Sequence, residues 1–205
     1  MTTYNFDREI DRKKTNSLKY DFAVERGRDV DVLPLWVADM DFQAPKPVLD
    51  ALQNAVSHGI FGYSEVKGEY FDALYRWFDS RFDWQPKSEW LVKTPGVVFA
   101  LAMAVRALTK EGDSVLIQPP VYYPFKDRCI TYNKRKAVES PLIEKDGSYT
   151  IDFEDFERKA RDENTKLFIL CSPHNPVGRV WTEAELRRII EICQKHHVLI
   201  FSDEI

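Results

Sequence analysis

The sequence predicts an α/β protein with a mainly parallel sheet, and two observations lead to this fold class. From Trp90 onward, short apolar segments alternate with longer segments that have the apolar spacing of helices, which is typical of a parallel sheet covered by helices. Leu167–Cys171 is a continuous apolar run, too short for an amphipathic helix, and it fits a strand buried on both faces. Because helices must cover both faces of such a strand, we expect three layers, α/β/α.

The beginning of the chain is predicted to be less regular. Residues 1–31 are polar and charged with few periodic apolar positions, and they predict an N-terminal arm. Val32–Phe42 is short and apolar and contains acidic residues near its end, like a strand followed by a loop.

Two helices are expected next. Pro45 and Pro47 suit the first turn of a helix that ends near Gly59. A second helix contains Tyr70–Phe78, whose aromatic residues lie nearly all on one broad face. We interpret that face as core packing rather than as a ligand site.

From Trp90 to Phe201 the predicted elements alternate. Strands are expected at Trp90–Val92, Ser114–Gln118, Lys136–Glu139, Leu167–Cys171 and Val198–Phe201. Helices are expected at Gly96–Leu108, Val121–Tyr132, Asp152–Arg161 and from Thr182 onward, with a turn at Asp146–Gly147. Asp152 is a good N-cap, and Thr182 with Glu185 has the spacing of a capping box.

Composition restricts the classes of function. The chain has 205 residues, 44% hydrophobic and 30% charged, with a net charge of −4, which is ordinary for a globular protein with a substantial core. The acidic balance argues against a general nucleic-acid binder, and no apolar segment reaches the length of a membrane span. The N-terminus lacks the apolar core of a signal peptide. Cys129, Cys171 and Cys193 are widely spaced in apolar patterns, so we expect reduced core thiols and a cytoplasmic protein.

Loops at the carboxyl ends of the predicted strands contain the candidate site residues, because ligands bind at that edge of an open α/β sheet. Thr94–Val98 leads into a helix through Gly96, so its backbone N–H groups can bind an anion. Gln118–Phe125 brings aromatic residues to the crevice, where a ring can stack on a planar ligand or simply pack at a helix start. Asn175 lies between prolines in the third loop, either as a rigid hydrogen-bonding group or as a polar turn residue.

Asp203 adds a carboxylate at the end of the last predicted strand. Together these groups match the needs of pyridoxal 5'-phosphate: an anion site for the phosphate, a stacking ring, a hydrogen bond to the phenolic oxygen and a carboxylate that keeps the pyridine nitrogen protonated. The sequence therefore predicts this cofactor.

Six segments, taken together, resemble the fold type I pyridoxal-phosphate enzymes that are similar to class I and II aminotransferases. They resemble most closely the bacterial cystathionine β-lyase, or C–S lyase, branch of that family. The resemblance runs from about residue 5 to the end and is specific only in combination; the segments are Leu35–Phe42, Gly59–Tyr63, Pro95–Val98, Gln118–Tyr122, Ser172–Pro176 and Ser202–Ile205.

The resemblance implies a role for each matching residue. Gly96, Val97 and Val98 would bind the phosphate through their backbone N–H groups. Tyr122 would stack on the ring, with Tyr123 as its competitor, Asn175 would bind the phenolic oxygen and Asp203 would pair with the pyridine nitrogen. Tyr63 would reach the phosphate of the neighbouring subunit in a homodimer, and Ala38 would lie beside the substrate carboxylate.

The implied function is β-elimination from L-cystathionine or related cysteine S-conjugates, giving a thiol, pyruvate and ammonia. In the family, the Schiff-base lysine and the arginine that binds the substrate carboxylate follow the motif at Ser202–Ile205. We therefore expect an N-terminal portion that is inactive alone, with an arm and part of the small domain at 1–45 and an incomplete large domain at 46–205. An aminotransferase and a non-catalytic regulatory or interaction module are the alternatives.

Overall fold

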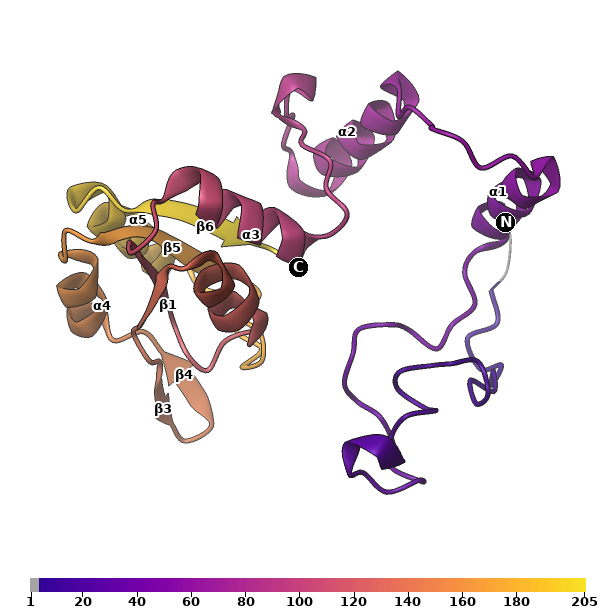
Figure 1. Ribbon diagram of the computed structural model, residues 1–205, viewed down its shortest axis with the longest axis horizontal. Coiled ribbons are helices and arrows are strands. Elements are labelled where there is room, and N and C mark those ends of the chain that lie inside the picture. The colour runs from indigo at the N-terminus through magenta and orange to yellow at the C-terminus, as the bar shows by residue number, and fades with distance from the viewer. Residues whose placement is uncertain (1–3) are drawn as a thin grey trace. The chain divides into compact units, whose positions relative to one another are not determined.

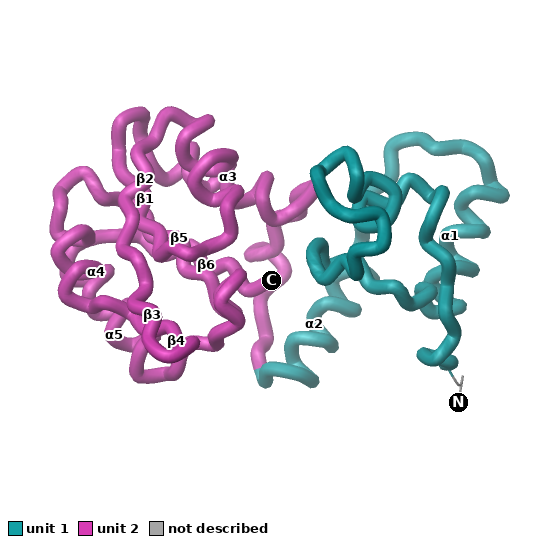
Figure 2. Tube along the Cα trace, turned by 90° about the horizontal axis from the view of Figure 1, so that it is seen from below, with its two compact units in different colours: residues 1–83 teal, residues 84–205 magenta. Residues whose placement is uncertain are grey.

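The computed structural model describes residues 4–205, which form two compact units. One unit extends to Asp83 and the other begins at Trp84 (Figure 2).

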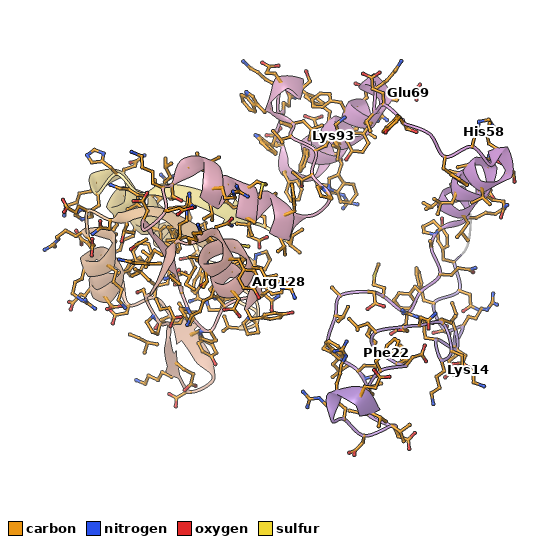
Figure 3. The ribbon with its side chains drawn as sticks, viewed as in Figure 1. Lys14, Phe22, His58, Glu69, Lys93 and Arg128 are labelled. Carbon is orange, nitrogen blue, oxygen red and sulfur yellow. The ribbon has the colours of Figure 1, made fainter. Side chains whose placement is uncertain are left out.

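The first unit contains helices and irregular segments but no strand among residues 4–83. It includes a 3-10 turn, η1 (Val24–Arg26), and two α-helices, α1 (Lys46–His58) and α2 (Gly68–Phe82). The expectation that α1 starts at the prolines and ends near Gly59 is confirmed, because Gly59 caps the helix in the left-handed conformation at φ 74°. His58 in the last turn of α1 and Glu69 in the first turn of α2 complement the helix dipoles (Figure 3).

Two expectations for this unit are wrong. Val32–Phe42 is not a strand, because side chains rather than a partner strand hold it: Arg12 donates to Asp39 at 2.5 Å and to Asp41 at 2.7 Å. The aromatic face of α2 is not core, since Trp77 is 54% exposed and no residue of α2 is buried. No sheet lies among residues 4–83 to cover that face.

The second unit is built on a four-stranded parallel sheet. Its strands are β1 (Ser114–Ile117), β2 (Lys136–Glu139), β5 (Thr165–Cys171) and β6 (Leu199–Asp203), in the order β2-β1-β5-β6 (Figure 2). A separate antiparallel hairpin, β3 (Ile143–Lys145) and β4 (Ser148–Thr150), turns at the expected Asp146–Gly147. The parallel sheet confirms the predicted fold class.

Helical segments cover both faces of this sheet. One apolar cluster joins Leu167 and Ile169 of β5 to α3 (Val97–Leu108) and to a π-helical turn, η3 (Phe125–Ile130). The other joins Phe168 and Leu170 to α4 (Phe153–Ala160) and α5 (Glu183–Lys195). Adjacent β5 residues therefore alternate between two cores, which is the three-layer arrangement that the apolar run predicts.

Both predicted N-caps are confirmed. Asp152 Oδ1 accepts from Asp155 N at 3.0 Å, and Thr182 forms a reciprocal capping box with Glu185. The three cysteines are also buried and unpaired, as expected.

Two other expected elements differ. Trp90–Val92 is not a strand, because Ser88–Trp90 forms a 3-10 turn, η2, and Val92 is 80% exposed and pairs with no strand among residues 4–205. The helix expected at Val121–Tyr132 is shorter: η3 begins only after Pro124, and a 3-10 turn, η4 (Thr131–Asn133), follows it. Prolines keep the start of that segment out of the helix.

Candidate functional site

The carboxyl ends of β1, β5 and β6 lie at one edge of the parallel sheet. Cys171 at the end of β5 pairs in register with Asp203 at the end of β6, and Ser172 N donates to Asp203 O at 2.9 Å. The loop that contains Asn175 therefore starts beside Asp203. The loop that contains Tyr122 follows β1, which is the neighbour of β5 on its other side.

Asp203 is a buried carboxylate with few partners. Its residue is 7% exposed, and Oδ1 accepts from the backbone N–H of Ile205 at 3.2 Å. Burial raises the pKa of Asp203, and nearby Glu204 adds to the shift. None of the arginines, lysines and histidines in the described part of the chain forms an ion pair with it. A cationic ligand group is therefore the natural partner for this carboxylate.

Asn175 is exposed on a tightly folded loop. Its backbone N–H donates to Cys171 Sγ at 3.4 Å, directly above the end of β5. The loop closes through His174, whose N–H donates to Arg179 O at 2.6 Å, and through Gly178, which donates to His174 O at 2.7 Å. Gly178 adopts the left-handed conformation at φ 73°, which favours glycine at this turn. The backbone of this loop is thus fixed, while Asn175 itself is exposed.

The two tyrosines of the loop after β1 have rings in contact, with centroids 5.6 Å apart, but they differ in exposure. Tyr122 is half-buried against the core on the α3 side, with its ring edge-to-face on Phe125 at a centroid distance of 5.7 Å. Tyr123 is 69% exposed. An anchored ring loses less conformational freedom when a planar ligand stacks on it, so the geometry favours Tyr122.

The first turn of α3 supplies free backbone donors. Gly96 is its N-cap, and Ala100 N makes the first helical bond to Gly96 O at 3.0 Å, so the N–H groups of Val97 and Val98 lie before the helical ladder. In Figure 1 this turn and the end of β6 lie at the same end of the unit. Val98 O accepts from Cys129 Sγ at 3.6 Å. The pKa of that thiol rises to about 11, through burial first and the charge of Asp203 second.

Ala38 and Tyr63 belong to the first unit. Ala38 follows Val37, a β-branched residue with φ 61°. Tyr63 is fully exposed in the loop between α1 and α2. Their expected roles in a shared site remain predictions.

His174 and Gln118 are residues of this edge that the sequence did not single out. Both are almost completely buried, and Gln118 Nε2 and His174 Nδ1 are buried polar atoms without a hydrogen-bond partner among residues 4–205. His174 Nε2 bonds Pro120 O at 3.0 Å and links two of the loops. A histidine between prolines directly after a buried strand is the sequence signal that could have identified His174.

The described residues show neither a metal cluster nor a membrane span. Within residues 4–205, no group of three or more His, Cys, Asp or Glu side chains is arranged to bind a metal, and no helix is long and apolar enough to cross a bilayer. The edge instead offers a carboxylate without an ion pair, an anchored ring, an exposed asparagine and free backbone N–H groups. These features suit a flat heterocycle with a basic nitrogen and an anionic tail.

Comparisons with known proteins agree with this chemistry. The family model "Aminotransferase class I and II" matches residues 30–205. Cystathionine β-lyase PatB of Bacillus subtilis is 47% identical over 201 residues, which are 98% of this chain and 52% of that protein. Cystalysin from Treponema denticola, whose crystal structure contains pyridoxal 5'-phosphate, is 41% identical with a TM-score of 0.90, covering 100% of this chain and 52% of that one.

A third relative is the pyridoxal-phosphate-bound C–S lyase from Staphylococcus hominis. It is 40% identical with a TM-score of 0.87, over 100% of this chain and 52% of that one. The chain thus spans about half the length of the relatives it matches.

Proposed function

Because the chain belongs to the aminotransferase class I and II family, we propose that the edge at Asp203 binds pyridoxal 5'-phosphate. We propose further that the full-length protein cleaves the carbon–sulfur bond of L-cystathionine or related cysteine S-conjugates. The single observation that carries it is the buried carboxylate of Asp203, which lies at the ligand edge of the sheet without a cation among the described residues. The names of the similar lyases support the choice of substrate.

The residues at the edge fit the cofactor. The backbone N–H groups of Gly96, Val97 and Val98 bind the phosphate with the positive end of the α3 dipole. The Tyr122 ring packs on the heterocycle, and the Asn175 amide donates to the phenolic oxygen. Asp203 accepts from the protonated ring nitrogen, and this ion pair compensates for the burial of the carboxylate.

The bound cofactor supplies an electron sink for bond breaking at the α- and β-carbons of an amino acid. The task of Asp203 is to hold a proton on the ring nitrogen while negative charge develops on the ligand. Tyr122 and Asn175 fix the plane of the ring, which determines the substrate bond that is aligned for cleavage. The net reaction consumes one water and releases a thiol, pyruvate and ammonia.

The proposal includes a homodimer with shared sites and a cytoplasmic location. Tyr63 is a fully exposed aromatic residue, as expected of a side chain that reaches into a partner's site. The proposal also places Ala38 beside the substrate carboxylate. The buried free cysteines are compatible with a reducing compartment. The domain division at residues 45 and 46 is part of the same proposal.

Tyr63→Phe in the full-length protein should weaken cofactor affinity, and a fully active monomer in sedimentation would refute the shared site.

The decisive experiment measures pyruvate and homocysteine release from L-cystathionine by the full-length protein, with and without pyridoxal phosphate. We expect the two products in equal amounts and dependent on the cofactor. Cofactor binding without release of pyruvate from this or other cysteine S-conjugates would refute the lyase assignment.

An aminotransferase is the second candidate, and the name of the matching family model favours it. Its signature is the transfer of an amino group to a 2-oxo acid, with no thiol released. The same samples, supplied with a 2-oxo acid acceptor, distinguish the two reactions.

A further inference from the structure

The loop that contains Tyr122 begins with Pro119-Pro120, which has no backbone N–H group. Only its carbonyl oxygens can anchor the backbone there, and the donors must come from elsewhere in the fold. Leu142 N donates to Pro119 O at 2.7 Å, from the segment between β2 and β3. The Pro120 carbonyl, one residue closer to Tyr122, is held by His174.

His174 reaches Pro120 across 54 positions of sequence. Its Nε2 lies 3.0 Å from Pro120 O, and a carbonyl can only accept, so the proton is on Nε2. The residue is 1% exposed, so water does not compete for this bond. Burial lowers the pKa of His174, which keeps the ring neutral near pH 7 with one N–H to donate.

The imidazole is itself held in place. Its ring lies edge-to-face on Trp181 at a centroid distance of 5.3 Å, and Trp181 Nε1 donates to Cys171 O at 3.0 Å. The His174 backbone is fixed through Arg179 O and through Gly178 N. The donor on Nε2 is therefore attached to the end of β5, one residue before Asn175.

We infer that His174 is a positioning residue: it ties the loop of Tyr122 to the loop of Asn175 and so fixes the stacking ring relative to the amide. This inference rests on the proposed function, in which both residues contact one ligand. Because His174 Nε2 donates to Pro120 O, a hydrogen bond connects the loop of Tyr122 to the loop of Asn175. The Tyr122 ring and the Asn175 amide therefore belong to one hydrogen-bonded unit instead of two independent loops.

Three variants of the full-length protein test this role. His174→Phe keeps an aromatic ring on Trp181 and removes the donor. His174→Gln places an amide N–H near the position of Nε2 and should restore the bond. His196→Phe is the matched control, because this substitution also removes one histidine hydrogen bond, between His196 Nε2 and Glu157 Oε1 at 3.2 Å. His196 lies at the end of α5, away from the ligand edge.

The first measurement is hydrogen exchange in the apoprotein, at the amide of Phe125. That amide donates to Tyr122 O at 3.1 Å and reports on the order of the loop. We expect His174→Phe to speed its exchange by about three- to tenfold, the equivalent of one net hydrogen bond. His174→Gln and His196→Phe should stay close to the wild type. Unchanged exchange in His174→Phe would overturn the inference.

The second measurement is the affinity of each apoprotein for pyridoxal phosphate. We expect about tenfold weaker binding by His174→Phe and recovery in His174→Gln, because a tethered loop is ordered before binding. Equal affinities of the wild type and both His174 variants would overturn the inference and leave the proposed function intact. A wild type that does not bind the cofactor would refute the proposed function itself. If His174→Phe does not fold, the test rests on His174→Gln. The exchange rate of its Phe125 amide and its affinity for pyridoxal phosphate must then match those of the wild type, and a difference in either would overturn the inference.

Discussion

Replacing Asp203 by asparagine removes a buried negative charge and keeps the size of the side chain. Its side-chain oxygen can still accept from Ile205 N, as Asp203 Oδ1 does at 3.2 Å. Burial raises the pKa of Asp203 from its ordinary value of 3.8, so the folded apoprotein holds this proton more tightly than the unfolded chain does. The stability of the apoprotein therefore falls as the pH rises from about 3.8 through the folded pKa. At pH 7, Asp203→Asn should leave the melting temperature of the apoprotein unchanged or raise it.

The effect on the reaction should be opposite. Two unit charges about 4 Å apart attract by about 4 kcal/mol at an effective dielectric constant of about 20, and by about 1 kcal/mol in bulk water. Asp203 is 7% exposed, so its interaction with a cationic ring nitrogen lies well above the bulk-water value. The neutral amide of asparagine offers only a dipole to the ring nitrogen, in place of the negative charge of the carboxylate. We expect pyruvate release to fall by at least about a hundredfold, or roughly 2.7 kcal/mol in the barrier.

The assay combines pyruvate release from L-cystathionine with a thermal melt of the apoprotein, on the same preparation of the full-length protein. Asp203→Glu is the control, because it retains the charge and should recover part of the rate. A folded Asp203→Asn variant with near-normal pyruvate release would refute the role of the carboxylate. A large loss of apoprotein stability at pH 7 would show instead that Asp203 serves the fold.

Three further predictions concern other residues. Tyr122→Leu should weaken cofactor binding by about tenfold, as loss of an aromatic contact predicts, whereas the exposed Tyr123→Leu should have little effect; the reverse order would transfer the stacking role to Tyr123. Hydrogen bonds with Lys195, the larger effect, and with His196 lower the pKa of Glu157 from 4.5 to about 2. The stability that this pairing adds is therefore present above pH 4.5 and lost as the pH falls through about 2, so the melting difference between Glu157→Gln and the wild type should shrink from pH 6 to pH 3; a constant difference contradicts it. Burial raises the pKa of Cys193 to about 12, so it should resist alkylation at pH 8 until urea unfolds the protein, and rapid native labelling would contradict its burial.

The sequence predicts the second unit well because its local signals agree with its tertiary contacts. The apolar run of β5 needs cover on both faces, and the capping box at Thr182 starts a helix that provides it. In the first unit, local sequence patterns gave two wrong predictions. Val32–Phe42 has the composition of a strand, but a strand needs a partner, and Arg12 holds the backbone there instead. Trp77 and its neighbours have the spacing of a core face, but Trp77 is 54% exposed and no residue of α2 is buried.

The candidate site was predictable as a set of loops, since parallel strands bring their carboxyl ends to one edge. Its internal geometry was not. The preference for Tyr122 over Tyr123 depends on the packing of Phe125, and the burial of Asp203 depends on its neighbours in the fold. The bond between His174 and Pro120 joins residues 54 positions apart, which no local pattern contains.

We propose that the cofactor lies at the carboxyl edge of the sheet with its ring nitrogen on Asp203. A crystal structure of the full-length protein with pyridoxal phosphate tests this most directly. We expect the ring nitrogen within hydrogen-bond distance of the Asp203 carboxylate and the ring against Tyr122. The phosphate should lie at the N–H groups of Gly96, Val97 and Val98. A cofactor bound elsewhere, or a ring nitrogen that faces a group other than Asp203, would contradict it.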